Sequence, residues 1–546
     1  MEYLLTAKEM QKFDVATIER IGIPALVLME RAAFAVYEEI LKALGMTGFG
    51  SKKVLVLAGC GNNGADGLAL ARMLAEHGQS TLPGGVIRSG KDTEDDSFQV
   101  EVVVCGDPEK VTDAWKTQYE ILKHFPVRTG SKQPVDEYDI LVDALFGVGL
   151  SRDITGEYAD LIRWLHERKG FKVAVDMPSG IHSDSGKVMG CAVKADLTVC
   201  FAFGKRGLYL YPGCEYAGKV VVKKIGIGEQ SFGDTKPGMF RFTEKVTDLL
   251  PDRIGDGNKG TFGKVLLAAG NRNMAGAAVL AAGSCYRTGA GMVKVLTREC
   301  NRVILQTAVP EALMCIWEPT VEKLAHVEED VSKSVNPDFY QWPDVLAIGP
   351  GLGTDEWAYG ILSSFLKDSD LPLVIDADGL NLLSKYGELM ELLCMQARGG
   401  RTFILTPHAG ELARLCGITI DEVKENPVKI AMGLAQKLNC IIVSKDARTY
   451  VCQNKKPVCM NTTGNSGMAV AGSGDVLTGV IAGLLAQGME PFAAAGVGVY
   501  LHGSAGDEAA DRLGERGMTA GDLVQAVAEV TKKGGRYHGN AGYQRA

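Results

Sequence analysis

The segment NSGMAVAGSGD, residues 465–475, and the apolar run VLTGVIAGLLAQG after it decide the fold of the second half of this chain. Apolar residues recur at helical spacing after Asp475, which predicts a buried helix that stops at Gly488. A loop of small residues at a helix N-terminus presents backbone N–H groups to a phosphate. Asp475 would then accept the proton of a substrate hydroxyl. Taken alone, GSGD is equally compatible with a glycine-rich turn that aspartate caps.

β-Branched runs alternate with helical patterns from residue 51 onward. This alternation is typical of βαβ units, which build a parallel sheet with helices on both faces. A second series of such runs begins at residue 264, after a glycine-rich lapse near residue 230. We therefore expect two independent α/β domains at residues 1–228 and 241–530, a linker at 229–240, a polar tail at 531–546 and an exposed insertion at 79–98.

Composition excludes several classes of protein. A net charge of -8 over 546 residues argues against nucleic acid or an anionic membrane as the main partner. The longest apolar runs are too short and too rich in glycine to span a bilayer, and residues 1–10 lack the basic start of a signal peptide. The 13 cysteines form no CxxC motif, so we expect reduced thiols and a cytoplasmic enzyme.

The segment GCGNNGADG, residues 59–67, follows an expected strand and opens an expected helix. Its first six residues match the G-x-G-x-x-G pattern of a dinucleotide-binding loop, although the acidic residue expected about 20 positions on is hard to identify. Asn62, Asn63 and Asp66 add side-chain oxygens that suit a sugar, an amide or a small cation. The alternative is that these residues satisfy the backbone of a turn.

Aspartates also end the next two apolar strands, at Asp143 and Asp176, and Ser179 follows closely. Ligands of open α/β sheets gather at the carboxyl ends of the strands. Oxygen ligands from Asn63, Asp143 and Ser179 would suit a hard cation. Asp176 is the candidate for acid–base catalysis.

The order NNGxDG, DALFGxG, VDxPSG and KADLTVCFAFGKRG resembles the N-terminal epimerase domain of the bifunctional NAD(P)H-hydrate repair enzymes. The resemblance implies a Rossmann-like three-layer sandwich that interconverts the R and S hydrates of NADH and NADPH (NADHX and NADPHX). It implies that potassium binds to Asn63, Asp143 and Ser179, and that Asp176 contacts the reacting ring. The implied substrate-binding residues are Asn62, Asn63, Gly64, Ala65, Asp66, Gly147, Val148, Gly149, Leu150, Ser151, Arg152, Asp153 and Asp176. Ala65 departs from the family, which usually has glycine there.

The motifs GPGLG, DADGLN, TPHAGE, SKDART and AGSGD of the second half are similar to those of the dehydratase domain of the same family. That domain has a ribokinase-like fold and dehydrates the S hydrate while it consumes ATP or ADP, normally with magnesium. The resemblance implies that Ala278, Gly351, His408 and Asp475 bind the hydrate. It implies adenine-nucleotide binding by Lys445, Asp446, Ala447, Arg448, Thr449, Asn465, Ser466, Gly467, Met468, Ala469, Val470, Ala471, Gly472, Ser473 and Gly474. The family commonly forms homo-oligomers.

Several of these residues also have ordinary structural explanations. His408 would serve equally well to hold a turn at a strand end. Asp376 and Asp378 are expected to be turn formers, and polar contact with the substrate is the less favoured alternative. Lys445 follows a β-branched strand beside the nucleotide loop and is expected to face phosphate.

Two other functions remain open on the sequence alone. AGSGD allows a small-molecule kinase that releases a phosphorylated product, and the first domain could be a binding module without catalysis. The convergence of Asn63, Asp143 and Asp176 argues against a mere binding module. We therefore expect a fused epimerase and dehydratase with Asp176 and Asp475 as its catalytic residues.

Overall fold

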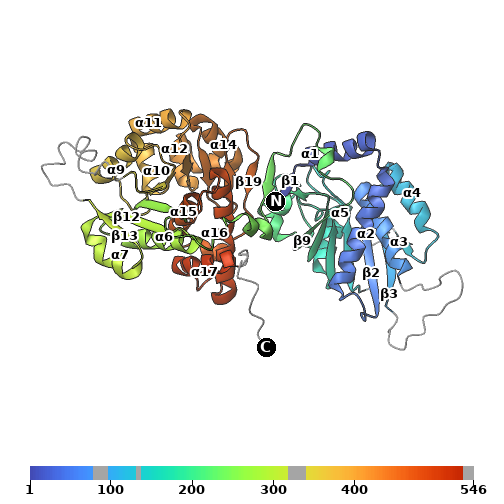
Figure 1. Cartoon of the computed structure of the whole chain (residues 1–546). Coiled ribbons are helices and arrows are strands. Elements are labelled where there is room, and N and C mark those ends of the chain that lie inside the picture. Colours follow the sequence, from blue (N-terminus) through green and yellow to red (C-terminus); the bar gives the residue numbers. More distant parts are fainter. Residues whose placement is uncertain (78–95, 131–136, 318–339, 533–546) are drawn as a thin grey trace, which may run out of the picture. The chain divides into compact units, whose positions relative to one another are not determined.

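The computed structural model describes residues 1–77, 96–130, 137–317 and 340–532. The chain divides into two compact units, Glu2–Gly238 and Met239–Ala546. Each unit contains a largely parallel sheet flanked by helices (Figure 1). The predicted α/β fold with two domains is confirmed.

The first unit contains a sheet of parallel strands in the order β4-β3-β2-β5-β6-β7-β9. The neighbours of β2 are β3 on one side and β5 on the other, so the direction of winding reverses between β2 and β5. Ligands of open sheets bind at such a switch point. The strands are β2 (Ser51–Ala58), β3 (Ser97–Val104), β4 (Arg128–Gly130), β5 (Ile140–Ala144), β6 (Phe171–Val175), β7 (Leu197–Phe201) and β9 (Lys219–Lys223). A separate parallel pair joins β1 (Glu2–Leu5) to β8 (Gly204–Lys205).

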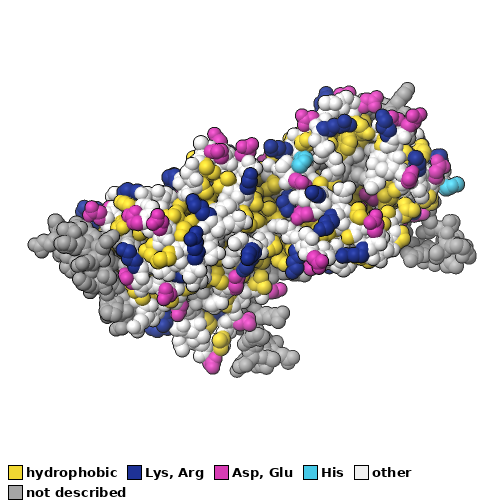
Figure 2. Space-filling view, turned by 90° about the horizontal axis from the view of Figure 1, so that it is seen from above, with side chains coloured by type: hydrophobic (Ala, Val, Ile, Leu, Met, Phe, Trp, Pro, Cys, Tyr) yellow, Lys and Arg dark blue, Asp and Glu magenta, His cyan; other side chains and the backbone are white. Residues whose placement is uncertain are grey.

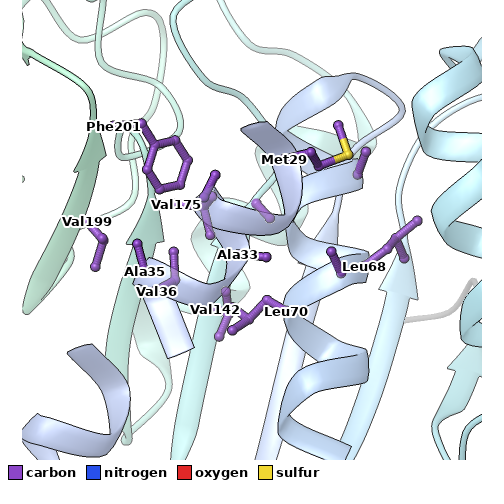
Figure 3. Close-up of a cluster of buried hydrophobic side chains, with 14 of the residues drawn as sticks. Met29, Ala33, Ala35, Val36, Leu68, Leu70, Val142, Val175, Val199 and Phe201 are labelled. Carbon is purple, nitrogen blue, oxygen red and sulfur yellow. The ribbon is translucent and has the colours of Figure 1, made fainter. Parts of the chain in front are cut away.

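Side chains of β2 point alternately to the two faces of the sheet, and each face packs against its own layer of helices. Val54 and Val56 belong to one buried cluster, whereas Leu55 and Leu57 belong to another. In Figure 3, Met29 and Val36 of one helix lie with Leu68 of another over strand residues Val142 and Val175. The first cluster contains side chains of α1 (Ala7–Val15), α2 (Ala25–Ala43), α3 (Asn62–Glu76) and α4 (Asp113–Leu122), and the second those of α5 (Glu157–Glu167). The π-helical turn η1 (Ala16–Ile21) continues α1. The three-layer sandwich is therefore as predicted.

The strands of the second unit lie in the order β13-β12-β11-β14-β15-β16-β17-β18-β19-β10. All neighbours are parallel except the pairs made by β18. The strands are β10 (Met239–Arg241), β11 (Lys264–Ala268), β12 (Met292–Thr297), β13 (Leu313–Ile316), β14 (Val345–Ile348), β15 (Leu373–Ile375), β16 (Phe403–Leu405), β17 (Ile441–Ser444), β18 (Tyr450–Cys452) and β19 (Val458–Met460).

The helices of the second unit form two packed groups that cover the two faces of its sheet (Figure 1). One group contains α6 (Ala275–Thr288), α7 (Arg302–Ala308), α15 (Ser473–Ala486), α16 (Pro491–Leu513) and α17 (Ala520–Lys532). The other contains α9 (Glu356–Lys367), α10 (Asp378–Lys385), α11 (Gly387–Arg398), α12 (Ala409–Cys416), α13 (Ile420–Glu425) and α14 (Pro427–Leu438). Every residue of α15 from Val476 to its end is buried, as the apolar run predicts.

Two stretches differ from the sequence-based expectation. The predicted linker, residues 229–240, begins with the short helix η5 (Glu229–Ser231) and the buried Phe232, whose ring centroid lies 4.6 Å from that of Phe13. The first unit thus extends to Gly238, because this aromatic anchor holds a stretch whose composition is otherwise typical of a linker. The predicted insertion at 79–98 overlaps β3 at its last two residues, and residues 79–95 lie outside the described part.

The surface in view in Figure 2 carries acidic and basic side chains intermixed, with apolar side chains among them, some in small groups. Within the described residues, no helix is both long and apolar enough to cross a membrane. The tail beyond Lys532 lies outside the described residues.

We predict that Gly479→Ala destabilises the second unit, because α15 approaches α6 closely at this glycine. A Cβ at Gly479 would lie 2.0 Å from Ser284 Oγ and 2.1 Å from the backbone oxygen of Ala281. Overpacking of this kind costs about 1–3 kcal/mol. The measurement is the midpoint of urea unfolding. Gly433→Ala in α14 is the control, because a Cβ there meets nothing within 4 Å. Equal midpoints for the two variants would contradict the close packing.

Candidate active sites

The first site lies where β2, β5 and β6 end. The loop after β2 leads into α3, as the GCGNNG pattern predicts. Glycine is required at Gly64, because a Cβ there would lie 1.8 Å from the backbone oxygen of Gly59. This close approach brings the first turn of α3, with Asn62 and Asn63, to the end of the strand.

Asn63, Asp143 and Ser179 come together at this edge. Ser179 Oγ donates to Asp143 Oδ1 at 2.5 Å, and the Ser179 amide donates to Oδ2 at 2.7 Å. A Cβ placed on Gly147 would lie 3.3 Å from Asn63 Oδ1, so the Asn63 side chain reaches the loop after β5. In the same loop, the Phe146 amide donates to Ser179 Oγ at 2.9 Å. The side-chain nitrogen of Asn63 is buried and has no hydrogen-bond partner in the described structure. Burial raises the pKa of Asp143 to about 6.

Asp176 follows β6 in a left-handed conformation with φ of 66°. Its Oδ1 accepts from Lys205 Nζ at 2.5 Å and from the Phe201 amide at 3.0 Å. Lys205 is 1% exposed. Burial lowers its pKa, but Asp176 and Cys200 outweigh this effect and raise it above the ordinary value.

Two further carboxyl groups face this ion pair. Asp66 on α3 has a pKa well above its usual range, because burial disfavours the charged form and Asp176 and Asp14 add negative charge. Burial also raises the pKa of Asp14 on α1, against the attraction of Lys205. The first site thus places a lysine-bonded aspartate beside a carboxyl group whose pKa is raised, an arrangement suited to acid–base catalysis.

The predicted substrate loop, residues 147–153, connects β5 to α5. Gly149, Ser151, Arg152 and Asp153 are exposed, and Leu150 packs against the buried cluster beneath α5. The Val148 carbonyl accepts a hydrogen bond from Ser183 Oγ at 3.4 Å. Ala65, the departure from the family pattern, is fully buried in α3, which shows that the small side chain fits without exposure.

The second site lies at the N-terminus of α15, where Asp475 occupies the first turn. Asp376, which follows β15, accepts from Lys445 Nζ at 2.6 Å and from Thr478 Oγ1 at 2.6 Å. Although burial raises it, these donors hold the pKa of Asp376 below its usual value. Burial, and next the charge of Asp376, raises the pKa of Asp475 to about 7. Asp475 therefore changes protonation state near neutral pH, as a proton acceptor must.

The end of the glycine-rich loop lies against the side chain of Lys445. A Cβ at Gly474 would lie 3.3 Å from Lys445 Nζ, so the ammonium group sits against the first turn of α15. The amides of a first helical turn have no partner within the helix and are available to an anion. Together, the lysine and these amides form a cradle for a phosphate group.

Side chains around the loop hold its backbone in place. Asp507 on α16 accepts from the Gly464 amide at 2.9 Å and from Asn465 Nδ2 at 3.1 Å. Ser466 Oγ donates to Glu515, and the buried His502 binds the Ser473 carbonyl through Nε2 at 2.9 Å. Ala469, Val470 and Ala471 are exposed, whereas Gly467 is buried. Burial lowers the pKa of His502 to about 4, so its ring is neutral at pH 7.

The turn that carries Lys445, Asp446, Ala447, Arg448 and Thr449 connects two antiparallel strands, β17 and β18. Asp446 Oδ1 accepts from the Ala447 amide at 2.8 Å, and Thr449 Oγ1 donates to the Asp446 carbonyl at 3.3 Å. Of these five residues, only Lys445 is held against Asp376 and Gly474.

The predicted hydrate-binding residues differ in how deeply they are buried. His408 caps α12 through Nδ1, which accepts from the Gly410 amide at 3.0 Å, and leaves half of its side chain exposed. Burial and then Lys445 lower its pKa. Gly351 is packed tightly against the start of α6, and Ala278 in that helix is completely buried beneath Gly270. The side chain of Ala278 therefore lies behind the surface of the site.

The sequence analysis missed residues that complete both sites. Asp376 was expected to form a turn, but the structure places it at the centre of the second site. Its position directly after a strand was the available signal. Asp378 does hold the turn, through the Gly353 amide at 2.8 Å and Asn381. Glu411, Thr478 and His502 were not considered, and Lys205 lies in the quoted KADLTVCFAFGKRG motif but was given no role.

The fold and the two clusters define an α/β enzyme with one acid–base site in each unit, the second beside a phosphate cradle. Residues 25–207 match the family described as YjeF-related protein N-terminus, and residues 265–529 match NAD(P)H-hydrate dehydratase. The bifunctional NAD(P)H-hydrate repair enzyme of Moorella thermoacetica is 34% identical, with 97% of each chain covered. That of Escherichia coli is 30% identical, over 96% of this chain and 93% of its own.

The chain belongs to the family of bifunctional NAD(P)H-hydrate repair enzymes. The second unit is also similar to the solved ADP/ATP-dependent NAD(P)H-hydrate dehydratase of Bacillus subtilis, which was co-crystallised with ATP and Mg²⁺. The identity is 29%, with 54% of this chain and 98% of the other covered and a TM-score of 0.45. The curated relatives and the two family matches confirm the expected family.

We predict that Lys445→Met destabilises the second unit by about 3 kcal/mol at pH 7, because it leaves the buried Asp376 without its counter-charge. In the unaltered protein the lowered pKa of Asp376 contributes stability above the unfolded pKa, and this contribution is lost as the pH falls. In the variant the pKa of Asp376 rises, so the destabilisation should shrink between pH 7 and pH 5.

Urea unfolding at the two pH values measures this effect. Lys456→Met, which breaks the exposed pair with Glu490, is the matched control and should cost less than about 1 kcal/mol. A loss from Lys445→Met that is the same at both pH values would contradict the charge explanation.

Proposed function

We propose that the first unit interconverts the R and S hydrates of NADH and NADPH, and that the second unit dehydrates the S hydrate at the expense of ADP or ATP. The products of the second step are NAD(P)H, phosphate and AMP or ADP. The single observation that carries the proposal is the placement of Asp475 beside Lys445 at the N-terminus of α15. Family membership supplies the substrates.

In the second site, Asp475 takes the proton of the hydrate hydroxyl, and the resulting oxygen attacks the terminal phosphoryl group of the nucleotide. Lys445 and the amides of the first turn of α15 stabilise the negative charge that develops there. The nucleotide leaves with one phosphate fewer. The ring nitrogen then expels the phosphate from carbon, and loss of a ring proton restores the double bond of NAD(P)H.

Asp376 keeps the lysine in place for this step. Its two oxygens are occupied by Lys445 and by Thr478, so the carboxylate fixes the ammonium group without competing for the phosphate. Magnesium would enter with the nucleotide, since phosphates are its usual ligands, and would neutralise phosphate charge. The loop held by Asp507 and His502 would enclose the nucleotide.

In the first site, the hydroxyl departs as water after it is protonated, and the ring nitrogen stabilises the cation that remains. Water then adds to either face. Potassium would bind to Asn63, Asp143 and Ser179, whose oxygens suit a hard cation. The unpartnered amide nitrogen of Asn63 supports this proposal, because rotation of the amide would place its oxygen at that buried position.

A homo-oligomer and a cytoplasmic location remain predictions from the resemblance and from composition. We propose small molecules alone, the hydrates and an adenine nucleotide, as the partners of the two sites.

Two matched variants test which unit carries which reaction. Asp475→Asn should abolish recovery of NADH absorbance from the S hydrate, because no group takes the hydroxyl proton, and should leave epimerisation intact. Asp176→Asn should abolish epimerisation and leave dehydration intact, so that NADH absorbance recovers fast and then stops at the S fraction. The assay mixes R and S hydrates with magnesium, potassium and ADP or ATP. A stable phosphorylated hydrate in place of NADH would instead indicate a kinase.

We also predict that the dehydratase kcat/KM rises with pH through an apparent pKa of about 7, because Asp475 accepts a proton only when ionised. Burial also raises the pKa of Glu411 to about 7, so Glu411 is the alternative origin of this rising limb of the pH profile. Glu411→Gln keeps the cap of α12 and should leave the limb in place. Loss of the limb in Glu411→Gln would contradict the assignment to Asp475.

A further inference from the structure

Lys205 is a deeply buried charged residue of the first unit and has no role in the chemistry described so far. Lys205 lies on β8, where it is paired with Leu5 of β1, and its side chain is 1% exposed. Its Nζ donates to Asp176 Oδ1 at 2.5 Å and to the Phe201 carbonyl at 2.8 Å. The lysine is too buried to touch a substrate, so it acts through Asp176.

The contacts to Asp176 divide its two oxygens. Oδ1 accepts from both Lys205 and the Phe201 amide, whereas Oδ2 accepts no hydrogen bond from any described residue. The backbone of Asp176 is held by a hydrogen bond from its amide to the Val199 carbonyl. The carboxylate thus has one oxygen anchored to the protein and one available to a ligand.

The surrounding charges explain why a lysine is needed here. Asp66 on α3 interacts electrostatically with Asp176, Asp14 and Lys205, and the Cys200 thiol of β7 lies beside the lysine. Neighbouring carboxyl groups disfavour each other's ionised form. The ammonium group is bonded to Asp176 rather than to Asp66, so Asp66, whose pKa is raised, is the candidate proton carrier.

We propose that Lys205 is a positioning residue of the first site, which fixes Oδ1 of Asp176 and leaves Oδ2 directed at the substrate, while Asp66 carries the exchangeable proton. This inference rests on the proposed epimerase function. Asp66 gives its proton to the departing hydroxyl, which leaves as water as the carbon–oxygen bond breaks and the ring nitrogen forms a double bond to that carbon. A water molecule adds to the opposite face and gives its proton to Asp176. The reverse reaction uses the same pair in opposite roles, so atoms and charge balance.

The test compares full-length Lys205→Met with the unaltered enzyme in initial rates of epimerisation, corrected for the uncatalysed reaction. Without this bond the Asp176 carboxylate loses its counter-charge and its fixed orientation, so kcat/KM should fall by about 10². The rising limb of the pH profile should move about one pH unit or more higher, and part of the rate should return at alkaline pH. A purely structural role would not move this limb.

Controls separate charge from folding. The dehydratase rate in the same chain reports on the second unit and should be unchanged. Lys223→Met removes another lysine paired with carboxylates in the first unit, Glu38 and Glu39, and should leave epimerisation unchanged. Lys205→Arg keeps the charge and should keep the pH limb, even if Lys205→Met folds poorly. In the Asp176→Asn background, Lys205→Met should cause no further loss.

Each outcome has a distinct meaning. An unaltered enzyme no faster than the uncatalysed reaction would overturn the epimerase function itself. A fast unaltered enzyme together with an unchanged rate and pH limb in Lys205→Met would overturn only the role of Lys205. A folded Lys205→Arg that is as inactive as Lys205→Met, or an additive loss in the double variant, would also overturn it.

Discussion

A lysine bonded to a buried aspartate is the interaction on which both sites depend. In the first unit the pair is Lys205 and Asp176, and in the second it is Lys445 and Asp376. An isolated buried carboxylate would take up a proton, because desolvation disfavours its charge. The lysine opposes this at short range and fixes one oxygen of the aspartate in each site. Such a pair gains little net stability by itself, and its value lies in setting charge at a defined place.

Each pair stands beside another carboxyl group whose pKa is raised. That group is Asp66 in the first unit and Asp475 in the second. After burial, the negative charge of the paired aspartate contributes to this raised pKa, so it favours a neighbour that carries a proton. The two units reach this arrangement without a shared sequence repeat. Parallel sheets favour it, since their strands deliver polar side chains to one edge.

The differences between the sites follow from what surrounds each pair. In the second unit Lys445 meets Gly474 and the open amides of α15, so that positive charge faces outward to a phosphate. In the first unit the lysine is completely enclosed, and the oxygens of Asn63, Asp143 and Ser179 gather nearby at the same sheet edge. Phosphoryl transfer requires the outward-facing charge, whereas exchange of a hydroxyl for water requires only a proton donor and an acceptor. One family thus combines two chemistries on related scaffolds.

The sequence by itself determined what local patterns can encode. β-Branched runs that end in Gly or Asp predicted the parallel strands, and the apolar spacing after Asp475 predicted α15. Positions at strand ends marked Asp143 and Asp176 as candidate site residues. Only the tertiary structure decided the partners. Lys205 is 29 positions from Asp176, and Lys445 is 69 from Asp376. The burial of Phe232, which extends the first unit into the expected linker, was equally invisible. Burial and charge pairing depend on which strands become neighbours, and that information is distributed over the whole chain rather than written in any one segment.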